Sequence, residues 1–157
     1  MESDPAPSHS IAGGETYISR SRLPFPMPTP KRVLIVEDDQ DMVRFLAAIV
    51  EAEGFEALAV GDAFSGITEA VRERPALIIT DMQMPAGGGS VLLQRLRGNA
   101  RTSRIPIMVV TGTVDPSHED ELLQSGAARV LFKPIDPKRF AEELRALVSK
   151  GSSSPQA

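Results

Sequence analysis

The sequence predicts an α/β fold in which one parallel, five-stranded sheet is covered by helices on both faces. Short runs of branched aliphatic residues alternate five times with segments that carry helix start and stop signals. The runs contain few polar residues, as expected for strands that are buried on both faces of a sheet. Alternation of strand and helix with short connections is typical of a doubly wound parallel sheet. The chain has 157 residues, 41% of them hydrophobic, which suits one domain with a buried core.

Each predicted strand is followed by a turn or by the start of a helix. The strands are expected over residues 32–36, 56–60, 77–80, 107–110 and 129–132. The helices are expected from about 40 to 53, from Asp62 to about 74, from about 90 to 97, from Asp115 to Gly126 and after Asp136. Aspartate is a favoured N-cap, and glycine or proline is favoured where a helix stops, as at Gly54, Pro75, Gly98 and Gly126.

Two segments lie outside this alternation. Residues 1–30 contain six prolines with scattered serine and glycine and show no sustained period, so we expect a disordered leader. Its proline-rich end favours polyproline II, which could dock in a partner's aromatic groove, but nothing in the sequence specifies a partner. Residues 151–157 are expected to form a flexible tail. The folded domain is therefore expected over residues 31–150.

Bulk composition argues against several classes of function. The net charge of −4 contrasts with the concentrated basic face of proteins that bind duplex nucleic acid, so we expect no DNA partner. The chain has no cysteine, which excludes disulfides and thiolate metal sites. No apolar run is long enough to span a bilayer, and no basic segment leads into one at the N-terminus. We expect a soluble, cytoplasmic protein without a membrane partner.

Polar side chains follow four of the five predicted strands. Glu37 and Asp38 follow the first strand, Asp81 follows the third, Thr111 follows the fourth and Lys133 follows the fifth. The carboxyl ends of parallel strands meet at one edge of the sheet, where such folds place their sites. The sequence therefore predicts one pocket that holds three carboxylates, a hydroxyl and an ammonium group.

Three carboxylates in one pocket require either raised pKa values or a bound cation. Two like charges about 4 Å apart repel by roughly 4 kcal/mol at an effective dielectric constant of about 20. Oxygen ligands without histidine or cysteine select a hard ion, and few protein ligands favour Mg²⁺ over Ca²⁺. Asp81 follows a central strand directly and is the expected nucleophile. Asp39 instead lies where a helix opens and is expected to be its N-cap.

Four motifs around these residues resemble the receiver domain of bacterial two-component response regulators. They are Ile35-Val36-Glu37-Asp38-Asp39, Asp81-Met82-Gln83-Met84-Pro85, Val110-Thr111-Gly112 and Phe132-Lys133-Pro134. The resemblance covers about residues 31–150 and implies a flavodoxin-like (βα)5 fold. It implies that Asp81 accepts a phosphoryl group from a histidine kinase or histidine phosphotransfer protein, and that the phosphorylated domain signals by binding another protein.

The resemblance also implies a magnesium site. Asp38 and Asp81 would hold Mg²⁺ together with the backbone carbonyl of Gln83, and Glu37 would act through bound water. Lys133 would pair with the oxygens of the phosphoryl group or of Asp81.

Three further roles complete the site. Thr111 would bind the phosphoryl group and relay its presence. Gly112 is small enough to leave the site open to water. The family also implies a cis peptide bond before Pro134. A receiver of this kind hydrolyses its own phosphoryl group slowly and is not a turnover enzyme.

The sequence departs from the family pattern in three places. The family usually has Tyr or Phe three residues before the lysine as a rotating switch, but this position is Val130. The segment 86–89 reads Ala-Gly-Gly-Gly, for which we expect an unusually mobile loop. No sequence pattern of an effector domain follows the last predicted helix. Because Val130 replaces the aromatic switch, the usual coupling between phosphorylation and the signalling surface is in doubt.

Three other functions are alternatives to a receiver domain. A phosphatase of the haloacid-dehalogenase type needs a second aspartate two residues after its nucleophile, where this chain has Gln83. A flavodoxin relative would place a phosphate beside Glu37 and Asp38, which would repel it. A receiver-like interaction module that works without phosphorylation is favoured by Val130 and opposed by the intact set of charged site residues.

Overall fold

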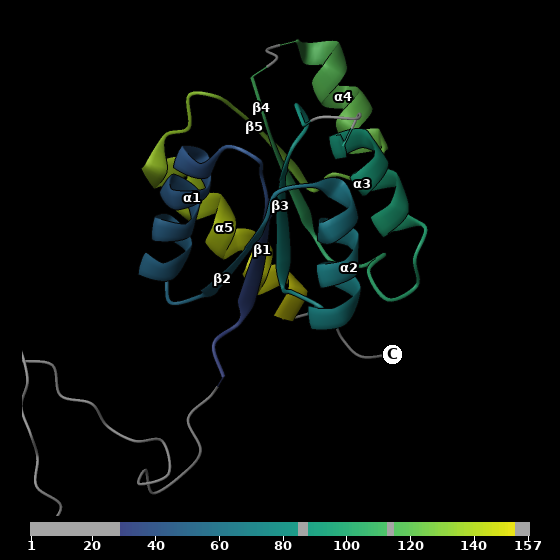
Figure 1. Ribbon diagram of the computed structural model, residues 1–157. Helices are drawn as coiled ribbons and strands as arrows, with labels where there is room; N and C mark the ends of the chain where they lie inside the picture. The colour runs from purple at the N-terminus through teal and green to yellow at the C-terminus, as the bar shows by residue number, and fades with distance from the viewer. Residues whose placement is uncertain (1–28, 85–87, 113–114, 153–157) are drawn as a thin grey trace, which may run out of the picture.

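The computed structural model describes residues 29–84, 88–112 and 115–152, and there the predicted α/β fold is confirmed. Five parallel strands form one sheet in the order β2-β1-β3-β4-β5 (Figure 1). The strands are β1 (Arg32–Val36), β2 (Glu56–Val60), β3 (Leu77–Asp81), β4 (Ile107–Thr111) and β5 (Arg129–Phe132). The order reverses between β1 and β3, which is the point where doubly wound sheets place their sites.

Five helices connect the strands and cover both faces of the sheet. They are α1 (Gln40–Ala52), α2 (Ala63–Glu73), α3 (Gly88–Arg97), α4 (Pro116–Gln124) and α5 (Pro137–Ser152). Helices α1 and α5 lie on one face, and α2, α3 and α4 lie on the other (Figure 1). Within the described residues, no helix is both long enough and apolar enough to cross a membrane.

The core consists of two hydrophobic clusters, one on each face of the sheet. Side chains alternate along each strand, so neighbouring residues contribute to opposite clusters. Ile35 and Ile79 face α1 and α5, where they pack with Phe140 and Leu144. The alternate strand residues face α2, α3 and α4 and form the second cluster with side chains of those helices. This cluster includes Leu34, Val36, Ile78, Leu92, Val109 and Val130. This burial on both faces explains why β1, β3 and β4 read as continuous apolar runs.

The predicted helix caps are confirmed at three helix starts. Asp39, Asp62 and Asp115 are the N-caps of α1, α2 and α4, and each carboxylate accepts a hydrogen bond from a backbone N–H two or three residues later. Gly54 follows α1 with φ = 89°, as predicted for a left-handed cap. At the end of α2 the left-handed position is instead Arg74, with φ = 45°.

Several boundaries differ from the sequence prediction, and β3 and β4 each extend one residue further than expected, to Asp81 and Thr111. Helix α3 begins at Gly88, two residues earlier than expected, so Gly88 and Gly89 are buried helical residues and not part of a mobile loop. A Cβ on Gly89 would lie 2.5 Å from the Met82 Cα and 2.8 Å from the Asp81 carbonyl oxygen. Only glycine fits this close approach of α3 to the end of β3 without movement. Helix α4 ends at Gln124 with Ser125 as its C-cap, and Gly126 closes it with φ = 113°, as predicted.

A further difference lies at the other end of the domain. Helix α5 extends to Ser152 and so includes the first two residues of the predicted tail 151–157. The other expectations about the leader, the tail and the loop fall on residues 1–28, 153–157 and 85–87, which lie outside the described residues.

Candidate functional site

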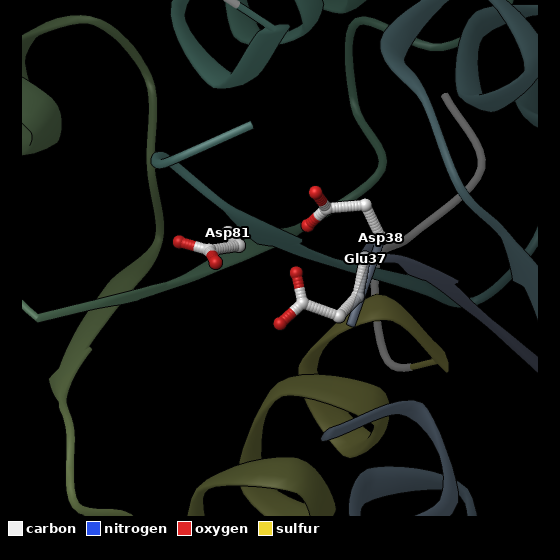
Figure 2. Close-up of side chains that lie close together, drawn as sticks. All are labelled: Glu37, Asp38 and Asp81. Atoms are coloured by element: carbon white, nitrogen blue, oxygen red, sulfur yellow. The ribbon is translucent and has the colours of Figure 1, made fainter. Parts of the chain in front are cut away.

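Three carboxylates meet at the carboxyl-terminal edge of the sheet. Glu37 and Asp38 directly follow β1, and Asp81 is the last residue of the adjacent strand β3. Each offers a carboxylate oxygen that lies within 4.8 Å of the others. Figure 2 shows the side chains of Glu37 and Asp38 extending toward Asp81. Glu37 and Asp81 are buried and Asp38 is exposed, so the cluster opens to solvent on the side of Asp38.

Glu37 is an unusual buried acid. Its side chain is 2% exposed, and neither carboxylate oxygen has a hydrogen-bond partner among the described residues. Its backbone N–H donates to the Val60 carbonyl at 3.0 Å, which extends the β1–β2 ladder and holds the side chain in place. Burial, followed by the negative charge of Asp81, raises the pKa of Glu37 from 4.5 to about 7. Such a carboxylate is suited to bind a cation or to accept a hydrogen bond from an ordered water molecule.

Lys133 supplies the positive charge of the site. Its Nζ lies 2.9 Å from Asp81 Oδ2 and 3.7 Å from Glu37 Oε1. Burial opposes its charge, but the hydrogen bond and charge of Asp81, with Glu37, outweigh burial and raise the pKa of Lys133. The Lys133–Pro134 peptide bond is cis, as the resemblance implied. Lys133 is therefore held as an ammonium group against the predicted phosphoacceptor.

Thr111 and Gly112 lie at the end of the neighbouring strand. Thr111 is the last residue of β4 and is fully buried, and its carbonyl accepts a hydrogen bond from the Lys133 N–H at 2.8 Å. A Cβ on Gly112 would lie 3.5 Å from the Gln83 side-chain oxygen, which is an ordinary contact. The Gln83 side chain thus reaches the segment that follows β4.

Gln83 also fixes the predicted phosphoacceptor through its backbone. Its N–H donates to Asp81 Oδ1 at 2.9 Å. One oxygen of Asp81 is therefore held by this amide and the other by Lys133. The carboxylate is oriented from both sides, while the role of the Gln83 carbonyl as a metal ligand stays a prediction.

The predicted switch position lies inside the core. Val130 is 6% exposed and belongs to the cluster on the α2, α3 and α4 face, together with Leu122 of α4. It pairs with Val109 of β4 in the sheet register. Val130 is thus a packed core residue of β5, two strands away from Asp81 of β3.

The residues present fit a hard divalent cation. The cluster offers only oxygen ligands, and neither oxygen of the buried Glu37 has a hydrogen bond within the described residues, although Oε1 lies 3.7 Å from the Lys133 Nζ. Asp38 and Asp81 complete a set of acids that suits Mg²⁺ with water in its remaining positions. The structure therefore brings together the three predicted metal ligands that act through their side chains, Glu37, Asp38 and Asp81.

One supporting residue was missed in the sequence. Gly89 lets α3 lie directly against the backbone of Asp81 and Met82, which fixes the end of β3. A run of glycines predicts a loop, because glycine is common in turns. Glycine is also found where two backbones pack closely, and the sequence alone does not distinguish the two cases. A buried hydrophobic residue just before the run, Met84, was the available signal that the chain packs inward here.

The comparisons with known proteins agree with this arrangement. A family model described as the response regulator receiver domain matches residues 33–145. The DNA-binding response regulator MtrA of Mycobacterium tuberculosis is 32% identical over 126 residues, which are 80% of this chain and 54% of MtrA. The chain thus spans about half the length of that relative. The polar-differentiation response regulator DivK of Brucella anthropi is 29% identical over 117 residues, which are 74% of this chain and 95% of DivK.

A solved structure supports the fold. The receiver domain of a sensor histidine kinase from Pseudomonas aeruginosa, with a magnesium ion coordinated in its active-site cleft, superposes with a TM-score of 0.71 at 22% identity. The match covers 77% of this chain and 99% of that domain.

Proposed function

The chain belongs to the response regulator receiver domain family, and on that premise we propose that it is a Mg²⁺-dependent phosphoacceptor. In this proposal Asp81 takes a phosphoryl group from a histidine kinase or a histidine phosphotransfer protein. The observation that carries the proposal is the position of Lys133, whose Nζ lies 2.9 Å from Asp81 Oδ2 beside the acidic cluster. A nucleophilic carboxylate, an ammonium group and a set of metal ligands are the groups that phosphoryl transfer needs.

The transfer step follows from these contacts. A carboxylate oxygen of Asp81 forms a bond to phosphorus while the bond from phosphorus to the donor breaks, and the donor leaves with the electron pair. Lys133 neutralises negative charge at the reacting oxygens, and the Gln83 N–H holds the carboxylate in orientation. Mg²⁺ held by Asp38 and Asp81, with Glu37 through water, would neutralise charge on the phosphoryl oxygens. Thr111 ends the adjacent strand β4 and would donate its hydroxyl to the bound phosphoryl group.

Incubation with acetyl phosphate and Mg²⁺ tests the proposal without knowledge of the kinase. Intact mass spectrometry should show a single phosphoryl adduct that forms only when Mg²⁺ is present. A chain that stays unmodified under these conditions, while it binds Mg²⁺, would contradict the phosphoacceptor function.

The same site should hydrolyse its phosphoryl group slowly. Gln83 stands two residues after Asp81 and carries no acidic proton, so no general acid assists departure of the aspartate. We expect the phosphorylated protein to persist for seconds to hours, measured by phosphate release after removal of the donor. Steady hydrolysis of a generic phosphomonoester at about 1 s⁻¹ or faster, a common enzyme rate, would instead support a phosphatase.

The partners follow from the proposed chemistry. We propose that a phosphohistidine protein supplies the phosphoryl group in the cell and that the phosphorylated domain signals by binding a protein target. MtrA is a DNA-binding protein, but this chain matches only about half of it, so DNA binding is not transferred to this chain.

The buried Val130 predicts where phosphorylation will be sensed. An aliphatic side chain with a stiff χ1 cannot rotate between the core and the surface as an aromatic residue does. We therefore expect beryllofluoride to change amide hydrogen exchange mainly at residues 82–89 and 112–124, with little change at residues 130–132. The Asp81→Asn variant should show no response. A response centred on β5 and α5 would show that the missing aromatic residue does not matter.

A further inference from the structure

A second candidate site lies at the opposite edge of the sheet. A groove of about 470 Å³ is lined by residues that precede β1, β3 and β4, with Val148 of α5 beside them. Two hydrogen bonds hold these amino ends together, from the Ala76 N–H to the Arg32 carbonyl at 2.8 Å and from the Ile78 N–H to the Pro106 carbonyl at 3.0 Å. Pro75, Pro106 and Val148 give the groove an apolar lining. The groove is therefore built from the ordered sheet and not from a loose surface loop.

The groove has an excess of positive charge. Lys31, Arg74 and Arg104 line it with exposed side chains, and none of them forms an ion pair within the described part of the chain. The acid at the groove, Glu73, is already paired with Arg32 and with Arg72. Three cations without counterions thus gather in a chain whose net charge is −4. An anionic ligand would complement this charge.

The backbone conformation of Arg74 indicates a functional role for its side chain. Arg74 is the C-cap of α2 and has φ = 45° and ψ = 62°, a left-handed conformation that favours glycine. The corresponding turn after α1 uses Gly54 at φ = 89°. A strained non-glycine residue is a sign of function when its side chain faces a candidate site. Here the side chain is one of the three cations of the groove.

The backbone around Arg104 is fixed by a buried contact. The Arg97 guanidinium donates from one nitrogen to the carbonyls of Ser103 and Ile105, both at 2.8 Å. It also donates to the Gly126 carbonyl at 2.7 Å. These bonds hold both neighbours of Arg104, so this cation is carried by an ordered loop.

The positive surface continues beyond the groove. A second hollow shares Arg74 with the first and is lined by Ile67, Val71 and Arg101 as well. We call Lys31, Arg74, Arg101 and Arg104 the basic tract. Two joined hollows with apolar and cationic linings suit an extended ligand better than a compact one.

We propose that the basic tract binds an acidic polypeptide segment that also carries apolar side chains. Its carboxylates would pair with the four cations, and its apolar side chains would cover Pro75, Pro106 and Val148. A single-stranded nucleic acid fits less well, because such ligands stack on aromatic side chains and the described lining of both hollows has none. The tract lies at the edge away from Asp81, so this binding is independent of the proposed phosphoryl transfer.

A labelled peptide tests the proposal directly. The probe is a fluorescein-labelled peptide of alternating aspartate and leucine, titrated with the full chain and followed by fluorescence anisotropy. We expect saturable binding that weakens with added salt, and at least tenfold loss of affinity in Arg74→Gly/Arg104→Ser. The matched control is Lys138→Gln/Arg139→Gln, which removes two exposed charges from the start of α5 and should change affinity less than twofold. A peptide with asparagine in place of aspartate should bind at least tenfold more weakly.

The single variant Arg74→Gly separates binding from folding. Glycine adopts the left-handed conformation without strain, so the melting temperature should equal or exceed that of the parent chain, while peptide affinity falls several-fold. Equal losses in the two double variants, or no saturable binding of the peptide, would overturn the proposal. Tighter binding of an oligothymidylate than of the acidic peptide would overturn it in favour of nucleic acid. Asp81→Asn should bind the peptide normally, so failure here is distinct from failure of the phosphoacceptor proposal.

Discussion

Asp81→Asn should abolish the phosphoryl adduct that acetyl phosphate forms with the parent chain. The amide is a poor nucleophile, and no other carboxylate at the site is both next to Lys133 at hydrogen-bonding distance and oriented by a backbone amide. The expected effect is a complete loss of the adduct in intact mass spectra. In the parent chain the adduct should also disappear on treatment with hydroxylamine, because an acyl phosphate is cleaved by this nucleophile.

A nearby aspartate provides the control for this experiment. Asp39 is exposed and caps α1 by accepting a hydrogen bond from the Asp41 N–H at 2.9 Å, and asparagine caps a helix about equally well. Asp39→Asn should therefore be phosphorylated like the parent chain. An adduct that persists in Asp81→Asn, or that maps to serine or threonine, would refute the assignment.

Glu37→Gln should stabilise the metal-free protein at about pH 8 by roughly 2–3 kcal/mol. The carboxylate is 2% exposed, and its pKa is raised from 4.5 to about 7 because burial and Asp81 disfavour its charge. A raised folded pKa gives stability that is fully present below pH 4.5 and is lost as the pH rises to 7. Above pH 7 the folded protein bears the full cost of the charge, which glutamine removes. Urea unfolding at about pH 4 and pH 8 should show the gain only at the higher pH.

Mg²⁺ should narrow the difference in stability between these two proteins at about pH 8. Millimolar Mg²⁺ should stabilise the parent chain by about 1–3 kcal/mol if it binds the folded state. Asp38→Asn should lose most of this gain, and Glu37→Gln should lose part of it. Glu51→Gln, which changes an exposed acid of α1, should respond to pH and to Mg²⁺ like the parent chain. Identical unfolding curves with and without Mg²⁺ would exclude the metal site in the isolated protein.

The fold and the carboxylate cluster could be predicted because both depend on local patterns and on one rule of topology. Apolar runs buried on both faces identify β1, β3 and β4 without knowledge of their neighbours. Parallel strands then bring Glu37, Asp81 and Lys133 to one edge, although 96 residues separate the first from the last. No packing detail was needed for this step.

Other features depend on packing that the sequence does not encode locally. The raised pKa of Glu37 follows from its burial and from the nearby charge of Asp81, which only the folded structure reveals. The basic tract gathers Lys31, Arg74, Arg101 and Arg104, which come from segments that lie far apart in the sequence. The left-handed backbone at Arg74 could not be predicted, since nothing in an arginine favours that conformation.

The close fit of Gly89 also has a consequence for protein engineering. A designer who sees three successive glycines would choose that stretch for inserting a tag, a fluorophore or a fused domain. Gly89 instead forms the contact surface between α3 and the strand that carries Asp81, with Met82 directly behind it. An insertion after Gly88 would push the helix away from the backbone of Asp81 and move the proposed phosphoacceptor together with it. The glycine stretch, which resembles a flexible spacer in the sequence, therefore fixes the position of the Asp81 carboxylate relative to Lys133.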